Sequence, residues 1–188
     1  GAQSGLNADF SGNGTNDSVE AVSSNGTAAV SWTATTAADV GYADNTLTIS
    51  YANAAGTTKA SGDSFAVGAH TITATATDGS SNASTCTFSV KVADTTNPTI
   101  TCGAHNNANV DTSGNGTNDA TEATSASGAA VTWSASTATD TGDDSVAITY
   151  STASGSTFAI GTHTITATAT DDSGNTSTCT FTVAVVDT

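Results

Sequence analysis

One twelve-residue segment occurs twice in this chain, and that repeat limits what the chain can fold into. The copies are Asp9-Phe-Ser-Gly-Asn-Gly-Thr-Asn-Asp-Ser-Val-Glu20 and Asp111-Thr-Ser-Gly-Asn-Gly-Thr-Asn-Asp-Ala-Thr-Glu122. Other landmarks recur in the same order after each copy: Trp32 and Trp133, His70 and His163, Cys86 and Cys179. A chain of 188 residues has room for two domains of about 90 residues each. The sequence therefore predicts two copies of one domain, residues 1–95 and 96–188.

Apolar residues alternate with small polar residues through much of each copy. In the second copy the clearest alternating positions are Ile165, Ala167, Ala169, Cys179, Phe181, Val183 and Val185. Short runs rich in Thr and Val, separated by turns of Asp, Gly, Ser and Asn, are typical of antiparallel strands. We expect an all-β fold of two tandem immunoglobulin-like antiparallel β-sandwiches. The short link Asp94-Thr-Thr-Asn-Pro98 predicts an end-to-end arrangement.

The charge of the chain excludes several classes of partner. There are 17 Asp and Glu residues against two Lys and Arg residues, which gives a net charge of −15. Two cationic side chains cannot neutralise the phosphates of a nucleic acid or the headgroups of an anionic membrane. We therefore expect no nucleic-acid partner and no binding to anionic membranes. No apolar run approaches the roughly 20 residues of a membrane span, so we expect no membrane insertion. The acidic residues serve either solubility or the binding of cations. Many of them lie at regular positions rather than in runs, which favours cation binding.

The repeated segment has the spacing of a calcium-binding loop. Such a loop has oxygen ligands at positions 1, 3, 5, 7, 9 and 12 and a glycine at position 6 for the sharp turn. The candidate ligands are Asp9, Ser11, Asn13, Thr15, Asp17 and Glu20 in the first loop, and Asp111, Ser113, Asn115, Thr117, Asp119 and Glu122 in the second. The two threonines would ligate through their backbone carbonyls. With three carboxylates a loop, we expect a weak affinity for Ca²⁺, on the order of 10⁻⁴–10⁻³ M.

Two other interpretations of the acidic residues stay open. The repeated segment lacks evident flanking helices, so it is similar to an EF-hand or dockerin loop without its helices, or it is a turn whose acids are merely hydrated. Further acids are candidates for a second site, although Asp-rich clusters are also ordinary turn chemistry. These acids form two groups: Asp39, Asp44, Asp140, Asp143 and Asp144, and Asp78, Asp94, Asp171 and Asp172.

The strand segments resemble a known family, the hyalin repeat or HYR module. The resemblance lies in Gly161-Thr-His-Thr-Ile-Thr-Ala-Thr-Ala-Thr-Asp171, in Asn97-Pro-Thr-Ile-Thr-Cys102 and in the first-copy run Gly68-Ala-His-Thr-Ile-Thr-Ala-Thr-Ala-Thr-Asp78. It covers nearly all of both copies and implies an immunoglobulin-like fold, tandem arrangement and an extracellular or cell-surface location. The family implies no catalytic activity. The calcium loop is not a usual part of the module.

The cysteines suggest a disulfide and a missing strand. Cys102 and Cys179 lie at inward positions of the first and last strands of the second copy, so we predict that they bond. Such a bond closes a long loop and contributes roughly 4 kcal/mol; the alternative is two buried free thiols. Cys86 corresponds to Cys179, and the counterpart of Cys102 would precede Gly1. We therefore expect the partner of Cys86 outside this chain, and the first strand of the first copy to be missing or supplied from outside.

Two explanations of that missing strand stay open. Either the sequence is a slice of a longer tandem-repeat polypeptide, or a neighbouring subunit supplies the strand by β-augmentation.

These observations favour a non-catalytic extracellular repeat. His70 and His163 recur at the same position, which indicates an architectural role, and no nucleophile–base–acid set can be assembled around His105. We expect a calcium- and disulfide-stabilised structural or adhesive module whose partners are neighbouring identical repeats or subunits in a surface fibre or filament. The alternative is an accessory module of a larger secreted protein that binds a glycan or protein ligand.

Overall fold

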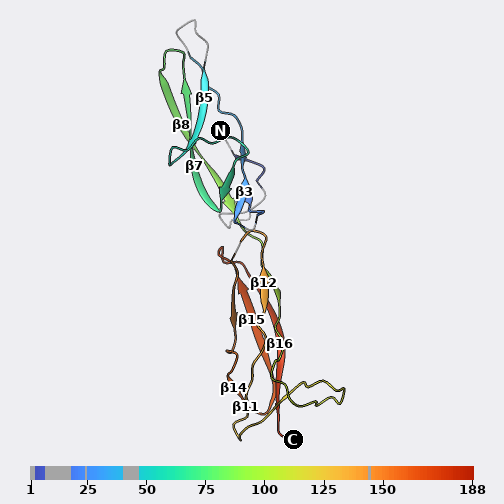
Figure 1. Cartoon of the computed structure of the whole chain (residues 1–188). Coiled ribbons are helices and arrows are strands. Elements are labelled where there is room, and N and C mark those ends of the chain that lie inside the picture. Colours follow the sequence, from blue (N-terminus) through green and yellow to red (C-terminus); the bar gives the residue numbers. More distant parts are fainter. Residues whose placement is uncertain (1–2, 7–17, 24, 40–46, 144) are drawn as a thin grey trace. The chain divides into compact units, whose positions relative to one another are not determined.

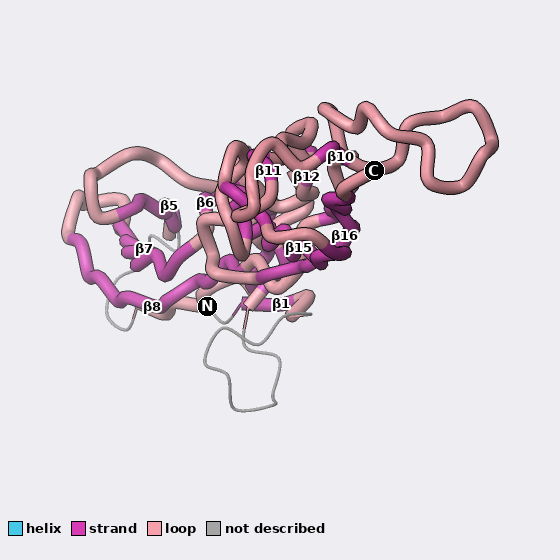
Figure 2. The backbone as a smooth tube through the Cα atoms, turned by 90° about the horizontal axis from the view of Figure 1, so that it is seen from below, coloured by secondary structure: helices cyan, strands magenta, loops and turns pink. Residues whose placement is uncertain are grey.

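The computed structural model describes residues 3–6, 18–23, 25–39, 47–143 and 145–188, which form strands and loops without a helix (Figure 2). The chain divides into two compact units. Unit 1 comprises residues 1–95 with 141–144, and unit 2 comprises residues 96–140 with 145–188. The predicted all-β fold class is confirmed, since each unit is an immunoglobulin-like assembly of mostly antiparallel strands around its own core. The described residues include no helix that could cross a membrane.

Unit 1 is built around one long antiparallel strand pair. Its strands are β1 (Gln3–Ser4), β2 (Val19–Glu20), β3 (Thr27–Ala29), β4 (Ser31–Trp32), β5 (Thr48–Asn53), β6 (Ser64–Ala66), β7 (Gly68–Thr77) and β8 (Ala83–Ala93). The main sheet has the order β2-β8-β7-β5, and smaller sheets pair β3 with β6 and β1 with β4. Strands β7 and β8 pair along their length (Figure 1). Polar residues, mostly threonines, alternate with apolar residues along both strands, so one face of the pair is apolar.

Unit 2 repeats the main sheet and one of the smaller sheets, and it has the strand pair β9–β12 in place of β1–β4. Its strands are β9 (Thr99–Thr101), β10 (Thr121–Glu122), β11 (Ala129–Ala130), β12 (Thr137–Thr139), β13 (Ala147–Tyr150), β14 (Thr157–Phe158), β15 (Gly161–Thr170) and β16 (Thr176–Val186). The main sheet has the order β10-β16-β15-β13, and smaller sheets pair β11 with β14 and β12 with β9. In both units the short strand β2 or β10 joins the main sheet in parallel with the last strand.

A tryptophan occupies the centre of each core. Trp32 packs against Tyr51, Phe65 and Phe88, with ring centroids 5.6–6.2 Å apart. Trp133 makes the equivalent contacts in unit 2. Fully buried aliphatic residues complete the cores: Val30, Ile72, Val90 and Val92 in unit 1, and Val131, Ile165, Val183 and Val185 in unit 2. Edge-to-face aromatic packing gives these small cores stability beyond the area that they bury.

A histidine fixes the start of the long strand pair in each unit. The Nε2 atom of His70 lies 2.8 Å from the carbonyl oxygen of Ala66, and His163 makes the same contact with Ala159. Each imidazole also lies against the core phenylalanine of its unit. The residue two positions before it is a glycine, Gly68 or Gly161, with φ of 129° or 134°. Only glycine adopts such angles readily, so the chain turns there into the long strand.

One disulfide is present, between Cys102 and Cys179. The S–S distance is 2.01 Å and the Cα atoms are 5.8 Å apart. Cys102 directly follows β9, and Cys179 lies in β16, the last strand in the sequence. The bond therefore links β9 to the main sheet. Cys86, the counterpart of Cys179 on β8, is a free and exposed thiol.

Candidate metal centre

The second copy of the repeated segment forms a loop whose base is closed by backbone hydrogen bonds. Val110 and Ala120 form an antiparallel bridge in which each N–H donates to the other's carbonyl, at 2.9 and 3.0 Å. The intervening residues extend away from the sheet beside β10 (Figures 1 and 2). The chain then enters β10, which is held against β16. The loop is therefore an excursion from a fixed base.

The carboxylate of Asp111 organises the first half of the loop. It accepts hydrogen bonds from the backbone N–H groups of Gly114 at 2.7 Å and Gly116 at 2.6 Å, and from the N–H and hydroxyl of Ser113, both at 3.1 Å. Gly114 and Gly116 have φ of 70° and 84°, which turns their N–H groups inward. These donors, Gly116 above all, hold the pKa of Asp111 below its usual value.

The carboxylate of Asp119 organises the other end of the loop. Its Oδ1 atom accepts hydrogen bonds from the N–H and the hydroxyl of Thr112, at 2.9 and 2.7 Å. The Thr112 side chain is the main reason that the pKa of Asp119 is lowered. The Asn115 side chain accepts from the N–H of Thr117 at 2.7 Å. Both loop aspartates are therefore held as anions by donors of the loop itself.

Glu122, the predicted last ligand, binds a different part of the chain. Its carboxylate accepts from the N–H of Thr188 at 3.0 Å and from the Thr188 hydroxyl at 2.8 Å. These two bonds, the backbone one first, lower the pKa of Glu122. In unit 1 the carboxylate of Glu20 accepts the same two bonds from Thr95, at 2.6 and 2.7 Å. Both predicted closing ligands thus secure the segment that follows the last strand.

The structure brings together only part of the predicted ligand set. Asp111, Ser113 and Asn115 lie in one turn, and Asp119 lies beside Thr112. Across the described ranges, Asp111, Asp119 and Glu122 do not form a group of carboxylates close enough to share an ion. Of the first loop, Glu20 lies within the described residues, whereas Asp9, Ser11, Asn13, Thr15 and Asp17 lie outside them.

The donor atoms of the second loop suit a calcium ion, but the positions of its predicted ligands match a calcium loop only in part. Its donors are all oxygens, the ligands that Ca²⁺ prefers, and its glycines make the sharp turn that a calcium loop needs. The mismatch is Glu122, whose two oxygens are engaged by Thr188. Sequence reasoning missed this pairing, although it carries a signal: an Asp-Thr dipeptide follows the last strand in both copies, at Thr95 and Thr188.

An acidic pair in unit 2 combines one residue from each of the two further acidic groups that the sequence suggested as candidates for a second site. Asp140 and Asp171 each place a carboxylate oxygen within 4.8 Å of the other's. The Asp171 carboxylate accepts hydrogen bonds from the backbone N–H and the side-chain amide of Asn175, at 2.7 and 2.9 Å. Asp78 and Asn82 make the same turn in unit 1. The turn therefore explains the geometry that Asp171 shares with Asp78, and an acidic pair alone does not identify a metal site.

Comparisons with known proteins address the family. The profile of the family described as "HYR domain" matches residues 13–92 and again residues 93–185. A comparison with curated proteins found no match. Among solved structures, the chain is similar to one described as "Structures of Clostridium thermocellum CbhA fibronectin(III)-like modules", at 15% identity over 90% of each chain. The TM-score of 0.33 is too low for that likeness to carry an argument.

Proposed function

Because this chain belongs to the HYR domain family, we propose that it is a non-catalytic structural and adhesive repeat module of an extracellular fibre or filament. One observation carries the proposal: both units repeat the same core and the same glutamate–threonine pairing after the last strand. A pairing that recurs at the exit of each unit supports a role in holding successive repeats. The disulfide fits an oxidising extracellular environment.

Calcium is the second part of the proposal. Asp111, Ser113, Asn115, Thr117 and Asp119 would hold the ion in unit 2, with the equivalent residues of the first loop in unit 1. A bound calcium ion would neutralise the charge of Asp111 and Asp119, whose carboxylates accept hydrogen bonds from backbone N–H groups. Glu20 and Glu122 reach an ion only when their hydrogen bonds with Thr95 and Thr188 open. Each loop would then brace the path into β2 or β10.

The described aromatic residues argue against the alternative of glycan binding. Sugar-binding sites commonly present exposed aromatic faces. Here every aromatic residue that the structure describes packs against another ring of its own core: Trp32, Tyr51, Phe65 and Phe88 in unit 1, and Trp133, Tyr150, Phe158 and Phe181 in unit 2. The histidines that a catalytic reading would use, His70 and His163, contact backbone carbonyls. The ring contacts of the aromatic residues and the carbonyl contacts of the two histidines both support a structural role for these side chains.

Calorimetric titration with calcium chloride tests the calcium part. We expect binding with dissociation constants on the order of 10⁻⁴–10⁻³ M, and a weakened unit 2 site in Asp111→Asn and Asp119→Asn. Asp63→Asn removes one charge outside both loops and outside the other acidic groups, and it serves as the control. No heat of binding at millimolar calcium, or equal binding by all four proteins, would show that the loops are ordinary turns.

A further inference from the structure

We propose that the outer edge of strand β13 in unit 2 pairs with β13 of a second copy of this chain, antiparallel and about a two-fold axis. In the described part of unit 2, β13 (Ala147–Tyr150) is the last strand of the main sheet and pairs only with β15. An edge strand can add a further strand to its sheet, so the other edge of β13 is an interaction surface. This lateral contact goes beyond the proposed function, since it involves neither the calcium loops nor the exit segments of the units.

The backbone groups of Ile148 and Tyr150 face this outer edge. The N–H of Ser151 donates to the carbonyl of Thr166 at 2.9 Å, so these two residues form a hydrogen-bonded pair between the strands. Hydrogen-bonded residues alternate along an antiparallel strand. Thr149 therefore also bonds to β15, whereas Ile148 and Tyr150 direct their N–H and C=O groups away from it. The outer edge of β13 thus offers two donors and two acceptors to an antiparallel strand.

Unit 1 covers the equivalent edge with its own chain. The connection from the core tyrosine to the core phenylalanine has 13 residues in unit 1 and seven in unit 2. The longer connection folds back along β5: the N–H of Lys59 donates to the carbonyl of Tyr51, and the N–H of Asn53 to the carbonyl of Thr57, both at 2.9 Å. Tyr51 corresponds to Tyr150, because the hydroxyl of each accepts a hydrogen bond from the segment after the core tryptophan. The edge that β13 leaves open therefore takes a returning strand in unit 1.

Strand β13 also lacks the features that usually protect an exposed edge. Natural edge strands carry a charged residue, a proline, a bulge or a covering segment. Residues 145–156 contain no charged residue and no proline, and β13 pairs with β15 in continuous register. In unit 1, by contrast, the covering segment carries Lys59, one of the two lysines of the chain. An uncharged strand is a partner that a chain of net charge −15 meets without like-charge repulsion at the contact itself.

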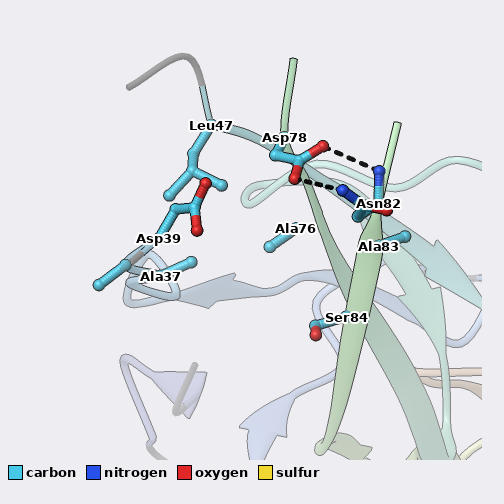
Figure 3. Close-up of a pocket in the computed structure, with 9 residues that line it drawn as sticks. Ala37, Asp39, Leu47, Ala76, Asp78, Asn82, Ala83 and Ser84 are labelled. Carbon is cyan, nitrogen blue, oxygen red and sulfur yellow. Dashed lines mark hydrogen bonds between the residues drawn. The ribbon is translucent and has the colours of Figure 1, made fainter. Parts of the chain in front are cut away.

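The acidic residues at one end of β13 favour an antiparallel pair. Asp171 follows the residue of β15 that pairs with the first residue of β13, and its carboxylate lies within 4.8 Å of that of Asp140. The unit 1 counterparts, Asp39 and Asp78, line one hollow at the start of β5 (Figure 3). Residues 151–156, at the other end of β13, are uncharged. An antiparallel pair places the acidic end of each copy beside the uncharged end of the other, whereas a parallel pair would bring four carboxylates together.

The alternation of backbone groups selects one register for the pair. With Thr149 of one copy opposite Thr149 of the other, Ile148 lies opposite Tyr150, and the two copies exchange four hydrogen bonds. Centring the pair on Ile148 or on Tyr150 would leave only one outward-facing residue of β13 opposite its equivalent. In the selected register the exposed Thr149 side chains meet on the solvent face, and the half-buried Ile148 and Tyr150 side chains meet on the core side.

A cysteine crosslink tests the register in the full chain. Cys86→Ser is the background, since it removes the exposed free thiol. Thr149→Cys places two thiols opposite each other at a spacing that a disulfide spans. Ala147→Cys is the matched control, because residue 147 lies on the same exposed face but about 13 Å from its equivalent in the other copy. With oxidised glutathione, we expect roughly tenfold more disulfide dimer from Thr149→Cys, measured by mass spectrometry. Equal yields, or more dimer from Ala147→Cys, would overturn the inference.

Hydrogen exchange tests the pairing without a new thiol. The contact is much smaller than a standard interface, so we expect a dissociation constant of roughly 10⁻⁴–10⁻³ M. As the concentration of the Cys86→Ser chain rises from well below to well above this value, the amides of Ile148 and Tyr150 should exchange several-fold more slowly, because they gain acceptors in the second copy. The amide of Thr149 bonds to β15 in both states and should not change.

A lysine on the edge should prevent the pairing. Thr149→Lys sets two like charges opposite each other, so the exchange of Ile148 should no longer depend on concentration. Thr178→Lys makes the same charge change at an exposed position in the same cross-strand row, two strands from the edge, and should leave the dependence intact. No slowing at β13 up to millimolar chain, or slowing at Ile49 of β5 instead, would overturn the inference. No calcium is added, so failure here is distinguishable from failure of the proposed function.

Discussion

The carboxylate of Glu122 is the acceptor of two hydrogen bonds from Thr188, one from its backbone N–H at 3.0 Å and one from its hydroxyl at 2.8 Å. Glu20 and Thr95 repeat the arrangement in unit 1. In each unit the glutamate follows the loop and the threonine follows the last strand. The pairing therefore couples the candidate calcium loop to the exit of the domain, and it gives the loop's last residue a structural role that needs no ion.

Removing the carboxylate should loosen the exit segment. In Glu122→Ala, the amide of Thr188 loses its acceptor, so its hydrogen exchange should become several-fold faster while amides of β15 and β16 are unchanged. Asp187→Ala, which removes a neighbouring exposed acid, is the matched control. Unchanged exchange at Thr188 in Glu122→Ala would mean that the pairing contributes nothing to order in solution.

The same pairing should compete with calcium for Glu122. Thr188→Ala removes the hydroxyl donor and makes Oε2 more available, so calcium should bind the unit 2 loop a few-fold more tightly than in the parent chain. Thr180→Ala, an exposed threonine on β16, should leave the affinity unchanged. If Thr188→Ala has no effect in the same titration, Glu122 is not a calcium ligand.

Acid should destabilise the protein through its hydrogen-bonded carboxylates. The pKa values of Asp78, Asp111 and Asp119 are lowered from 3.8, and that of Glu122 from 4.5, each mainly by hydrogen bonds from neighbouring groups. Because the folded pKa values lie below the unfolded ones, the stabilisation is complete above pH about 4.5 and is lost as pH falls through the folded values. Urea unfolding midpoints should be flat from pH 7 to about 5 and decline below. A midpoint that rises on acidification would contradict this assignment.

The disulfide should stabilise unit 2 alone. Cys102→Ser removes a crosslink over 77 residues and should cost roughly 2–4 kcal/mol of unfolding free energy in unit 2. Hydrogen exchange by mass spectrometry should show faster opening in β15 and β16 and no change in β7 and β8. Cys86→Ser, at an exposed free thiol, is the control and should change neither unit. Uniform destabilisation of both units would show that they unfold as one.

The cores should be equally sensitive to cavities. Ile72 and Ile165 are almost fully buried at equivalent positions, at 0% and 1% exposure. Truncation of either to alanine should cost roughly 2–5 kcal/mol. Denaturant unfolding followed by tryptophan fluorescence measures the loss, since Trp32 and Trp133 report on their own cores. A much smaller cost at Ile72 would indicate that unit 1 collapses around the cavity.

The sequence determines some of these features better than others. Alternation over ten or more residues marks β7, β8, β15 and β16, because a strand with one buried face must place an apolar residue at every second position. Strands β2 and β10 span two residues each, too few to show a period, so their parallel pairing with the last strand could not be foreseen. The all-β class therefore followed from the alternating segments and the turns between them, and it did not depend on strands β2 and β10.

The function of the repeated loop could not be predicted from the sequence. Asp, Ser, Asn and Gly at these spacings suit a calcium ion, but a carboxylate is also stabilised by inward N–H groups, as Asp111 is by Gly116. A calcium site and a turn closed by its own hydrogen bonds use the same residues, so the spacing of these residues cannot distinguish the two. The role of Glu122 depended on Thr188, a residue brought near only by the fold of β16 against β10. The repeated Asp-Thr dipeptide marks the position of this threonine, but it does not reveal that the glutamate is its partner.

The most direct test of the account is thermal unfolding of the disulfide-bonded chain with excess calcium and with excess chelator. If the loops bind calcium as braces, calcium at ten times the dissociation constant should raise the free energy of unfolding by about 1.4 kcal/mol a site, and the gain should disappear in the Asp111→Asn, Asp119→Asn double variant for unit 2. The same melting temperature with calcium and with chelator would contradict the account, and would leave the repeated loops as turns held by their own hydrogen bonds.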